Sequence, residues 1–248
     1  MRKRSYSLIF LAAFCANSAI NIFALYNDFL LLEQLTKPLI IFFLMGFYLH
    51  KEEKSSAYLF ILFISWIGNL LFMFKSPSYT IAGLICFWGT LLLFSHLTMN
   101  DLDEYLEAKF KKRSTFILLA IFTSYVVGII GILGPNLGDY YFVMLAYAIT
   151  LAFLGFIVSL LFIENPKNIF RLSFLIGILI LFVDASIICY QLFIEDNIII
   201  SVTVRGLYIL AQLLICFYFM YEHTPKNFTK WLEVRQKKYF YWPFGPAT

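Results

Sequence analysis

Two ionisable residues, Asp184 and Arg205, interrupt long apolar segments of the sequence. A charged side chain inside a membrane-spanning helix is costly, and it usually serves a function. One segment ends near Phe193 and the next begins near Asn197, so a short turn makes the two helices antiparallel neighbours. At 1.5 Å per residue, Asp184 lies about 13 Å and Arg205 about 12 Å from the same membrane boundary. We therefore predict that the carboxylate contacts the guanidinium, directly or through one intermediary. The alternative is a buried pair that only locks two helices together.

Further polar residues are expected at a similar depth, toward the outer face of the membrane. Tyr208 and Gln212 share a helix face with Arg205, because they follow it by three and seven residues. Asn69 lies about 8 Å below the outer boundary by the same helical rise, and Lys37 begins its segment near that level. Polar residues that only join helices would occur at all depths. The layering therefore favours a polar cavity in the outer half of a helix bundle.

The sequence offers little for metal chemistry. Its three histidines form no H-E-x-x-H pattern, and its four cysteines lie in apolar runs without a C-x-x-C pair. We therefore expect no metal and no other cofactor. One histidine, His96, lies within an apolar segment about 26 Å from the outer face. We expect it near the cytoplasm, either as an interfacial histidine or as a contact for a substrate.

Composition identifies the kind of element that must position these residues. Of the 248 residues, 61% are hydrophobic and only 14% are charged, and the mean hydropathy is +0.81. A soluble domain carries about 25% charged residues, and a disordered chain is poor in apolar residues, so both classes are excluded. A membrane-spanning helix needs about 20 apolar residues. We predict an all-α fold, a polytopic membrane bundle of eight transmembrane helices.

The apolar runs give the expected ends of these helices. Polar or helix-breaking stretches separate the runs, and the second run is short for a span unless it begins earlier, near Phe29. We expect one transmembrane domain, residues 1–221, and a basic and aromatic cytoplasmic tail, residues 222–248, of the kind that anchors at anionic lipid. The predicted helices are Ser7–Leu25, Thr36–His50, Ala57–Phe74, Tyr79–Thr98, Thr115–Leu133, Asp139–Ile163, Phe170–Phe193 and Asn197–Tyr221.

Lysine and arginine in short loops set the orientation of a membrane protein, because they stay on the cytoplasmic side. With the N-terminus in the cytoplasm, all of the 19 Lys and Arg residues except Lys37, Lys75 and Arg205 fall on that side. We therefore expect an integral protein of the bacterial inner (cell) membrane with both termini cytoplasmic. The net charge of +4 is too small to indicate nucleic acid, so the expected partners are membrane lipids. The sequence leaves the oligomeric state open.

Five short motifs contain most of the candidate polar residues described above. They are Lys37-Pro38-Leu39, Gly68-Asn69, Phe94-Ser95-His96, Phe182-Val183-Asp184, and Tyr208 with Ala211-Gln212. In this order, over about Thr36–Tyr221, they resemble the motifs of the YhhN family, the lysoplasmalogenases. Two positions differ: Asn69 stands where the family has aspartate, and Val183 stands where it has serine.

The resemblance implies an eight-helix integral membrane hydrolase. Such an enzyme cleaves the vinyl-ether bond of a lysoplasmalogen and releases a fatty aldehyde and a glycerophospho-alcohol. The two motif aspartates of the family are regarded as catalytic, and their positions are Asp184 and Asn69 here, with Tyr208 as a third candidate. The candidates for binding the lysophospholipid substrate are Lys37, Arg205, Gln212 and His96.

The chemistry supports the same group of residues. Vinyl-ether hydrolysis begins with protonation of a carbon, and water then attacks the oxocarbenium ion. It needs a positioned acid and a group that holds water or stabilises the cation. The amide of Asn69 cannot be the acid, but it can orient water or hydrogen-bond Asp184. Two alternatives stay open: a lipid-binding or lipid-sensing relative that lost one carboxylate, and, less favoured, a small transporter.

Overall fold

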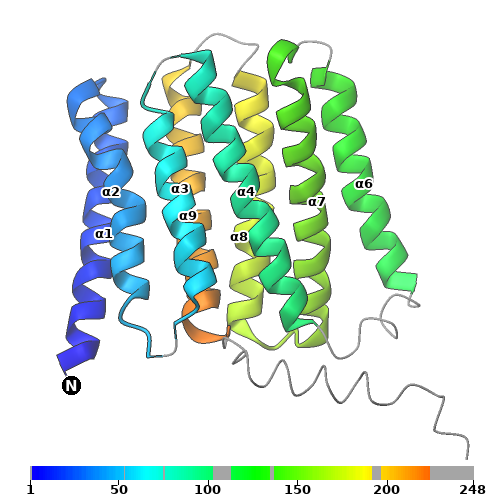
Figure 1. Ribbon diagram of the computed structural model, residues 1–248, viewed down its shortest axis with the longest axis horizontal. Helices are drawn as coiled ribbons and strands as arrows, with labels where there is room; N and C mark the ends of the chain where they lie inside the picture. The colour runs from blue at the N-terminus through cyan, green and yellow to red at the C-terminus, as the bar shows by residue number, and fades with distance from the viewer. Residues whose placement is uncertain are drawn as a thin grey trace, which may run out of the picture.

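The structure, a computed structural model, describes residues 2–52, 54–74, 76–102, 113–134, 137–191 and 197–223. In this part of the chain eight α-helices stand side by side with roughly parallel axes (Figure 1). They are α1 (Arg2–Tyr26), α2 (Leu30–Tyr48), α3 (Ser56–Leu71), α4 (Pro77–Asp101), α6 (Arg113–Leu133), α7 (Tyr141–Glu164), α8 (Ile169–Gln191) and α9 (Ile198–Tyr221). A short 3-10 turn, η2 (Gly138–Tyr140), precedes α7.

The lengths of the helices fit a membrane protein. Seven of them are long and apolar enough to cross a membrane, and the shorter α3 is apolar as well. A helix satisfies its backbone hydrogen bonds internally, as lipid requires. The chain is therefore an integral membrane protein, and the predicted all-α polytopic bundle is confirmed. The predicted tail, residues 222–248, lies almost wholly outside the described residues.

Local signals explain where several helices begin. The Ser55 side chain accepts a hydrogen bond from the Tyr58 backbone N–H at 3.3 Å, before α3. The Asn197 side chain accepts one from the Ile199 N–H at 2.9 Å, before α9. Such caps satisfy donors that have no partner in the first turn of a helix. Pro77 occupies the first turn of α4, where its missing N–H costs nothing.

The start of α2 differs most from the predicted boundaries. The apolar run predicts a start at Thr36, or an earlier one near Phe29, and α2 begins directly after Phe29. The earlier start is the correct one, and Pro38 therefore lies inside the helix. Glu33 becomes part of the first turn, where the helix dipole favours a negative charge. This turn brings Glu33 into the bundle.

Helices that follow one another in the sequence are mostly neighbours in space. α1 packs on α2, α3 on α4 and α8 on α9, while α6 lies at the edge of the bundle against α7 (Figure 1). The contact between α8 and α9 is close because Gly177 has no side chain. A Cβ atom at Gly177 would lie 3.2 Å from the backbone oxygen of Ala211. These two helices carry Asp184 and Arg205, so their close packing sets the relative positions of both residues.

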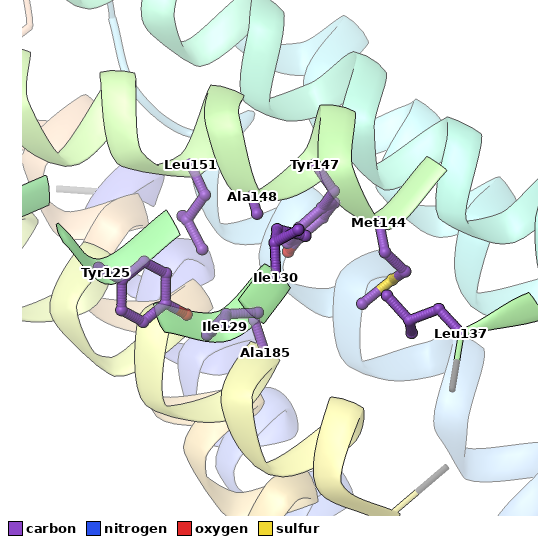
Figure 2. A pocket seen from close by; sticks show the side chains of 9 residues that line it. All are labelled: Tyr125, Ile129, Ile130, Leu137, Met144, Tyr147, Ala148, Leu151 and Ala185. Atoms are coloured by element: carbon purple, nitrogen blue, oxygen red, sulfur yellow. The ribbon is translucent and has the colours of Figure 1, made fainter. Parts of the chain in front are cut away.

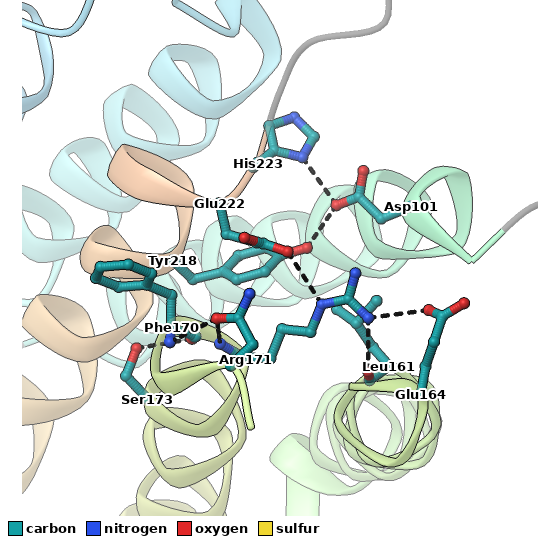
Figure 3. Close-up of polar contacts among 10 residues, drawn as sticks. Asp101, Leu161, Glu164, Phe170, Arg171, Ser173, Tyr218, Glu222 and His223 are labelled. Carbon is teal, nitrogen blue, oxygen red and sulfur yellow. Dashed lines mark hydrogen bonds and ion pairs between the residues drawn. The ribbon is translucent and has the colours of Figure 1, made fainter. Parts of the chain in front are cut away.

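Polar contacts join four helices at the end of the bundle where α4 and α9 finish (Figure 3). Asp101 of α4 accepts a hydrogen bond from the Tyr218 hydroxyl of α9 at 2.6 Å. Arg171 of α8 forms an ion pair with Glu164 of α7 at 3.0 Å. The Tyr218 ring stacks on Phe174, with ring centres 4.4 Å apart. These contacts pack that end of the bundle tightly.

Candidate active site

A cavity of about 200 Å³ lies between α2, α3, α4, α7, α8 and α9. It lies toward the end of the bundle where α4 and α7 begin, since Thr80 and Tyr140 are among its lining residues. The polar residues expected at one depth lie together on its wall. They come from α2, α3, α8 and α9, and they are Lys37, Asn69, Asp184, Arg205, Tyr208 and Gln212.

Asp184 of α8 contributes a buried carboxylate to this wall. The residue is 5% exposed, and its Oδ1 atom has no hydrogen-bond partner in the part of the chain that the structure describes. A buried polar atom without a partner costs free energy, and it calls for a specific explanation. A ligand in the cavity, or a proton that the carboxyl group gives and takes, supplies one.

Asn69 and Tyr208 form a hydrogen-bonded pair on the same wall. The Asn69 Nδ2 atom donates to the Tyr208 hydroxyl at 2.8 Å and to the Ser65 backbone oxygen at 2.9 Å. These two bonds use both hydrogens of the amide group. Because the Tyr208 oxygen accepts here, its own hydrogen is left to donate to another group in the cavity.

Of the two forms of contact predicted between Arg205 and Asp184, direct or through one intermediary, the direct one is not formed among the described residues. The Arg205 Nη2 atom pairs with the Glu33 Oε1 atom at 3.1 Å, and its Nη1 atom donates to Asn21 Oδ1 at 3.1 Å. α2 begins earlier than Thr36 and so carries the Glu33 carboxylate to the guanidinium. The other predicted form, a contact through one intermediary, stays a prediction. Glu33 is therefore a site residue that sequence reasoning missed. The spacing of four residues between Glu33 and Lys37, an ordinary pair on a helix face, was the available signal.

Two asparagines of α1 hold the start of α2 in place. The Asn17 Nδ2 atom donates to the Thr36 backbone oxygen at 2.9 Å. The Asn21 Nδ2 atom donates to the Thr36 hydroxyl at 2.8 Å and to the Glu33 backbone oxygen at 3.1 Å. These bonds fix the turn that carries Glu33 and Lys37 beside α9.

Lys37 is the second cation of the cavity wall. Its Nζ atom lies 5.9 Å from the centre of the Phe72 ring, within the range of a cation–π contact. Among the described residues it forms no hydrogen bond or ion pair. Much of the remaining lining is apolar, including Phe87, Leu91 and Phe94 of α4. The cavity thus combines charged groups with hydrocarbon surface, which suits an amphiphilic ligand with an anionic group.

The other two predicted substrate contacts are placed differently. Gln212 lies in the cavity, 4% exposed, and its Oε1 atom has no partner among the described residues. His96 does not line the cavity: it is exposed on α4, 3.5 Å from the Asn100 side chain. Within the described ranges no three His, Cys, Asp or Glu side chains are grouped to hold a metal ion.

Comparison with known proteins adds one match. A sequence model of the YhhN family matches residues 32–218, which is most of the chain. The matched range contains Glu33 and the six predicted polar residues of the cavity wall. The curated proteins and the solved structures gave no match.

Proposed function

The chain belongs to the YhhN family, and on this premise we propose that it is a lysoplasmalogenase-like hydrolase. The proposed substrate is a lysophospholipid with a vinyl-ether bond, and the products are a fatty aldehyde and a glycerophospho-alcohol. The proposed setting is the bacterial inner membrane, with both termini in the cytoplasm and the cavity toward the outer leaflet.

The observation that supports this function best is the position of Asp184. Its carboxylate oxygen is buried without a hydrogen-bond partner in the described part of the chain, and it faces a cavity that also contains two cations and apolar surface. A lysophospholipid has a phosphate, a reactive ether and a hydrocarbon chain. The lining offers a matching group for each.

In the proposed reaction Asp184 gives a proton to the vinyl carbon that is not bonded to oxygen. The electron pair of the double bond forms the new C–H bond, and the ether oxygen shares the positive charge of the oxocarbenium ion. Water then attacks the cationic carbon and returns a proton to the Asp184 carboxylate, which leaves a hemiacetal. When the hemiacetal collapses, the bond to the glycerol oxygen breaks and the hydroxyl proton passes to that oxygen. One carboxyl group thus acts first as acid and then as base.

Neighbouring residues have positioning roles in this scheme. Tyr208 has a hydroxyl hydrogen to donate, because its oxygen already accepts from Asn69. It can hold the attacking water or the ether oxygen. Lys37 and Arg205 provide positive charge for the phosphate. Arg205 is itself held by Glu33.

The test is incubation of the purified protein with lysoplasmenylethanolamine and measurement of fatty aldehyde release. We expect aldehyde from the vinyl ether and none from the alkyl-ether analogue, since the saturated ether has no double bond to protonate. The acyl lysophospholipid controls for a contaminating esterase. Absence of aldehyde from every lysoplasmalogen would contradict the proposal.

The asparagine at position 69 supports a second candidate function, that of a lipid-binding or lipid-sensing protein. Both hydrogens of its amide are engaged by Ser65 and Tyr208, and it provides no second carboxylate. A protein that binds the alkyl-ether analogue but hydrolyses no vinyl ether would fit this candidate.

A further inference from the structure

The volume of the cavity is too small to enclose a whole molecule of the proposed substrate. This volume is about 200 Å³, whereas pockets that enclose a small ligand run from roughly 300 to 1,000 Å³. A lysophospholipid is larger than most such ligands because of its long chain. The cavity therefore has room for the reacting part of the lipid, and the chain must leave it between helices.

A second, much smaller apolar space lies beside the cavity and shares lining residues with it. We call it the α6 crevice; its own lining residues are Tyr125, Ile129, Ile130, Leu137, Ala148 and Leu151, from α6, α7 and the turn between them. Figure 2 shows these side chains around one space between α6 and α7. The free volume is only about 10 Å³, so a chain enters by displacing side chains.

Three residues line both the cavity and the crevice: Met144, Tyr147 and Ala185. Ala185 directly follows Asp184, so the junction lies next to the carboxylate. At this junction Met144 packs on Leu137 (Figure 2). Methionine is unbranched and adaptable, so this contact can yield to a hydrocarbon chain.

The position of α6 gives the crevice access to lipid. α6 lies at the edge of the bundle, and its Tyr125 hydroxyl bonds to α8, 3.0 Å from the Phe182 backbone oxygen and 3.0 Å from the Ser186 hydroxyl. Farther along α6, Val127 and Ile132 are highly exposed apolar residues, as expected beside lipid tails. A chain that passes the junction reaches the bilayer along α6.

We propose that the α6 crevice holds the alkenyl chain of the lysophospholipid, with Ala148 and Ala185 determining how long a chain is accepted. This inference rests on the proposed function for the identity of the ligand. Ala185 lines the junction and Ala148 lines the crevice beyond it. A larger side chain at Ala185 would obstruct the junction, and one at Ala148 would obstruct the crevice.

Photo-crosslinking tests the chain path without requiring catalysis. The probe is an alkyl-ether lysophosphatidylethanolamine with a diazirine at the end of its chain, bound to the wild-type protein and mapped by mass spectrometry. We expect labelling around Ile129 and Ile130 of α6 and around Leu151 of α7. Labelling confined to Leu91 and Phe94 of α4, or no labelling, would overturn the proposal that the chain lies in the crevice.

The variant Ala148→Leu tests the same path through chain-length preference. We expect the ratio of kcat/KM for an octadecenyl substrate to that for an octenyl substrate to fall on the order of tenfold, since a few misplaced methylene groups have effects of this size. Ala120→Leu makes the same change at an exposed position of α6 and should leave the ratio unchanged. An unchanged ratio in folded Ala148→Leu contradicts the crevice.

The two proposals can fail separately. If the crevice is labelled but the wild-type protein releases no aldehyde in any assay, the proposed chain site is supported and the proposed hydrolase activity is contradicted. If aldehyde is released but labelling is confined to α4, the hydrolase activity is supported and the proposed chain site in the crevice is contradicted. The labelling uses only the wild-type protein, so it tests whether the chain lies in the crevice even if Ala148→Leu does not fold.

Discussion

At the scale of single residues, the site contains two carboxylates with different surroundings. The Glu33 carboxylate pairs with the Arg205 guanidinium at 3.1 Å. The Asp184 carboxylate has an oxygen without a partner among the described residues and faces the cavity. Removal of a buried ion-pair partner is strongly destabilising, whereas an unpaired group contributes little to stability. Glu33 should therefore matter for the fold and Asp184 for the chemistry.

Asp184→Asn should abolish aldehyde release and leave the folded state intact. The amide keeps the shape of the side chain, but it cannot give a proton to carbon and take one from water. Arg205 keeps its pairing with Glu33 in this variant, so no buried cation is left alone. The measurement is single-turnover aldehyde release, with the melting temperature in detergent as the folding control. A fully active Asp184→Asn protein would show that the site assignment is wrong.

Glu33→Ala should show the opposite pattern, with a loss of stability. It leaves the partly buried guanidinium of Arg205 with the neutral Asn21 as its one acceptor among the described residues. Breaking a fully buried ion pair costs roughly 3–5 kcal/mol. The side chains of this pair are 15% and 19% exposed, so we expect a smaller loss. Glu33→Gln keeps an acceptor oxygen and should lose less. Thermal unfolding in detergent measures both variants, and equal stability of Glu33→Ala and wild type would contradict the role given to the pair.

Asn69→Asp should raise the rate of vinyl-ether cleavage. The new carboxylate would accept a hydrogen bond from Tyr208 and would lie on the same wall as Asp184. Repulsion between two nearby carboxylates keeps one of them protonated, which the first step requires. A positioned acid or base is worth about 10²–10⁴-fold in rate. Asn69→Ala is the matched control, and a rate for Asn69→Asp no higher than wild type would argue against a two-carboxylate mechanism.

At the scale of helices, periodicity and apolar runs were sufficient for most of the site. Arg205, Tyr208 and Gln212 lie on one face of α9, and all three line the cavity as the spacing predicted. The partner of Arg205 could not be predicted in the same way. It depended on where α2 begins, and the charge of Glu33 placed the start of the predicted apolar run after the start of the helix. The crevice beside α6 depends on side-chain packing between distant segments, for which the sequence contains no local signal.

Gly177→Val tests how strongly the site depends on the packing of α8 against α9. A Cβ atom at Gly177 would lie 3.0 Å from Ile215 Cγ1 and 3.2 Å from the Ala211 backbone oxygen, so atoms of α9 must shift to make room for it. Overpacking of this kind costs about 1–3 kcal/mol, and it moves Asp184 relative to α9. We expect a lower melting temperature and a lower kcat.

Gly89→Val is the matched control on α4, because a Cβ atom there would meet nothing within 4 Å. It should change neither the melting temperature nor kcat by more than a small fraction of the effect of Gly177→Val. If the two variants behave alike, the effect comes from valine in a helix and not from the spacing of α8 and α9.

At the scale of the whole molecule, the two ends of the bundle differ. Buried aromatic rings and polar contacts such as the Asp101–Tyr218 bond fill the end where α4 and α9 finish. The cavity lies toward the other end. A transporter needs access from both sides, and the broken midplane helices typical of that class do not occur among the described residues. The difference between the ends favours a site that is open to one leaflet.

The number of spans depends on α3, the shortest of the apolar helices. Its 16 residues cover about 24 Å, whereas the hydrocarbon core is about 30 Å thick. Its contacts nevertheless follow α9 for much of this height. Near one end Tyr58 stacks on Phe219, with ring centres 4.2 Å apart, and near the other end Asn69 donates to Tyr208. A short helix that is packed along longer neighbours need not match the thickness of the lipid.

Reporter fusions on either side of α3 therefore decide the topology. An alkaline phosphatase fusion after Lys54 should be inactive and one after Pro77 active, while fluorescent-protein fusions should give the reverse. The reason is that the basic residues near Lys54 stay in the cytoplasm, and α3 carries the chain across. Activity on the same side for both positions would mean that α3 does not span. The two termini would then lie on opposite sides, and the alternation of basic loops that predicts eight spans would be accidental.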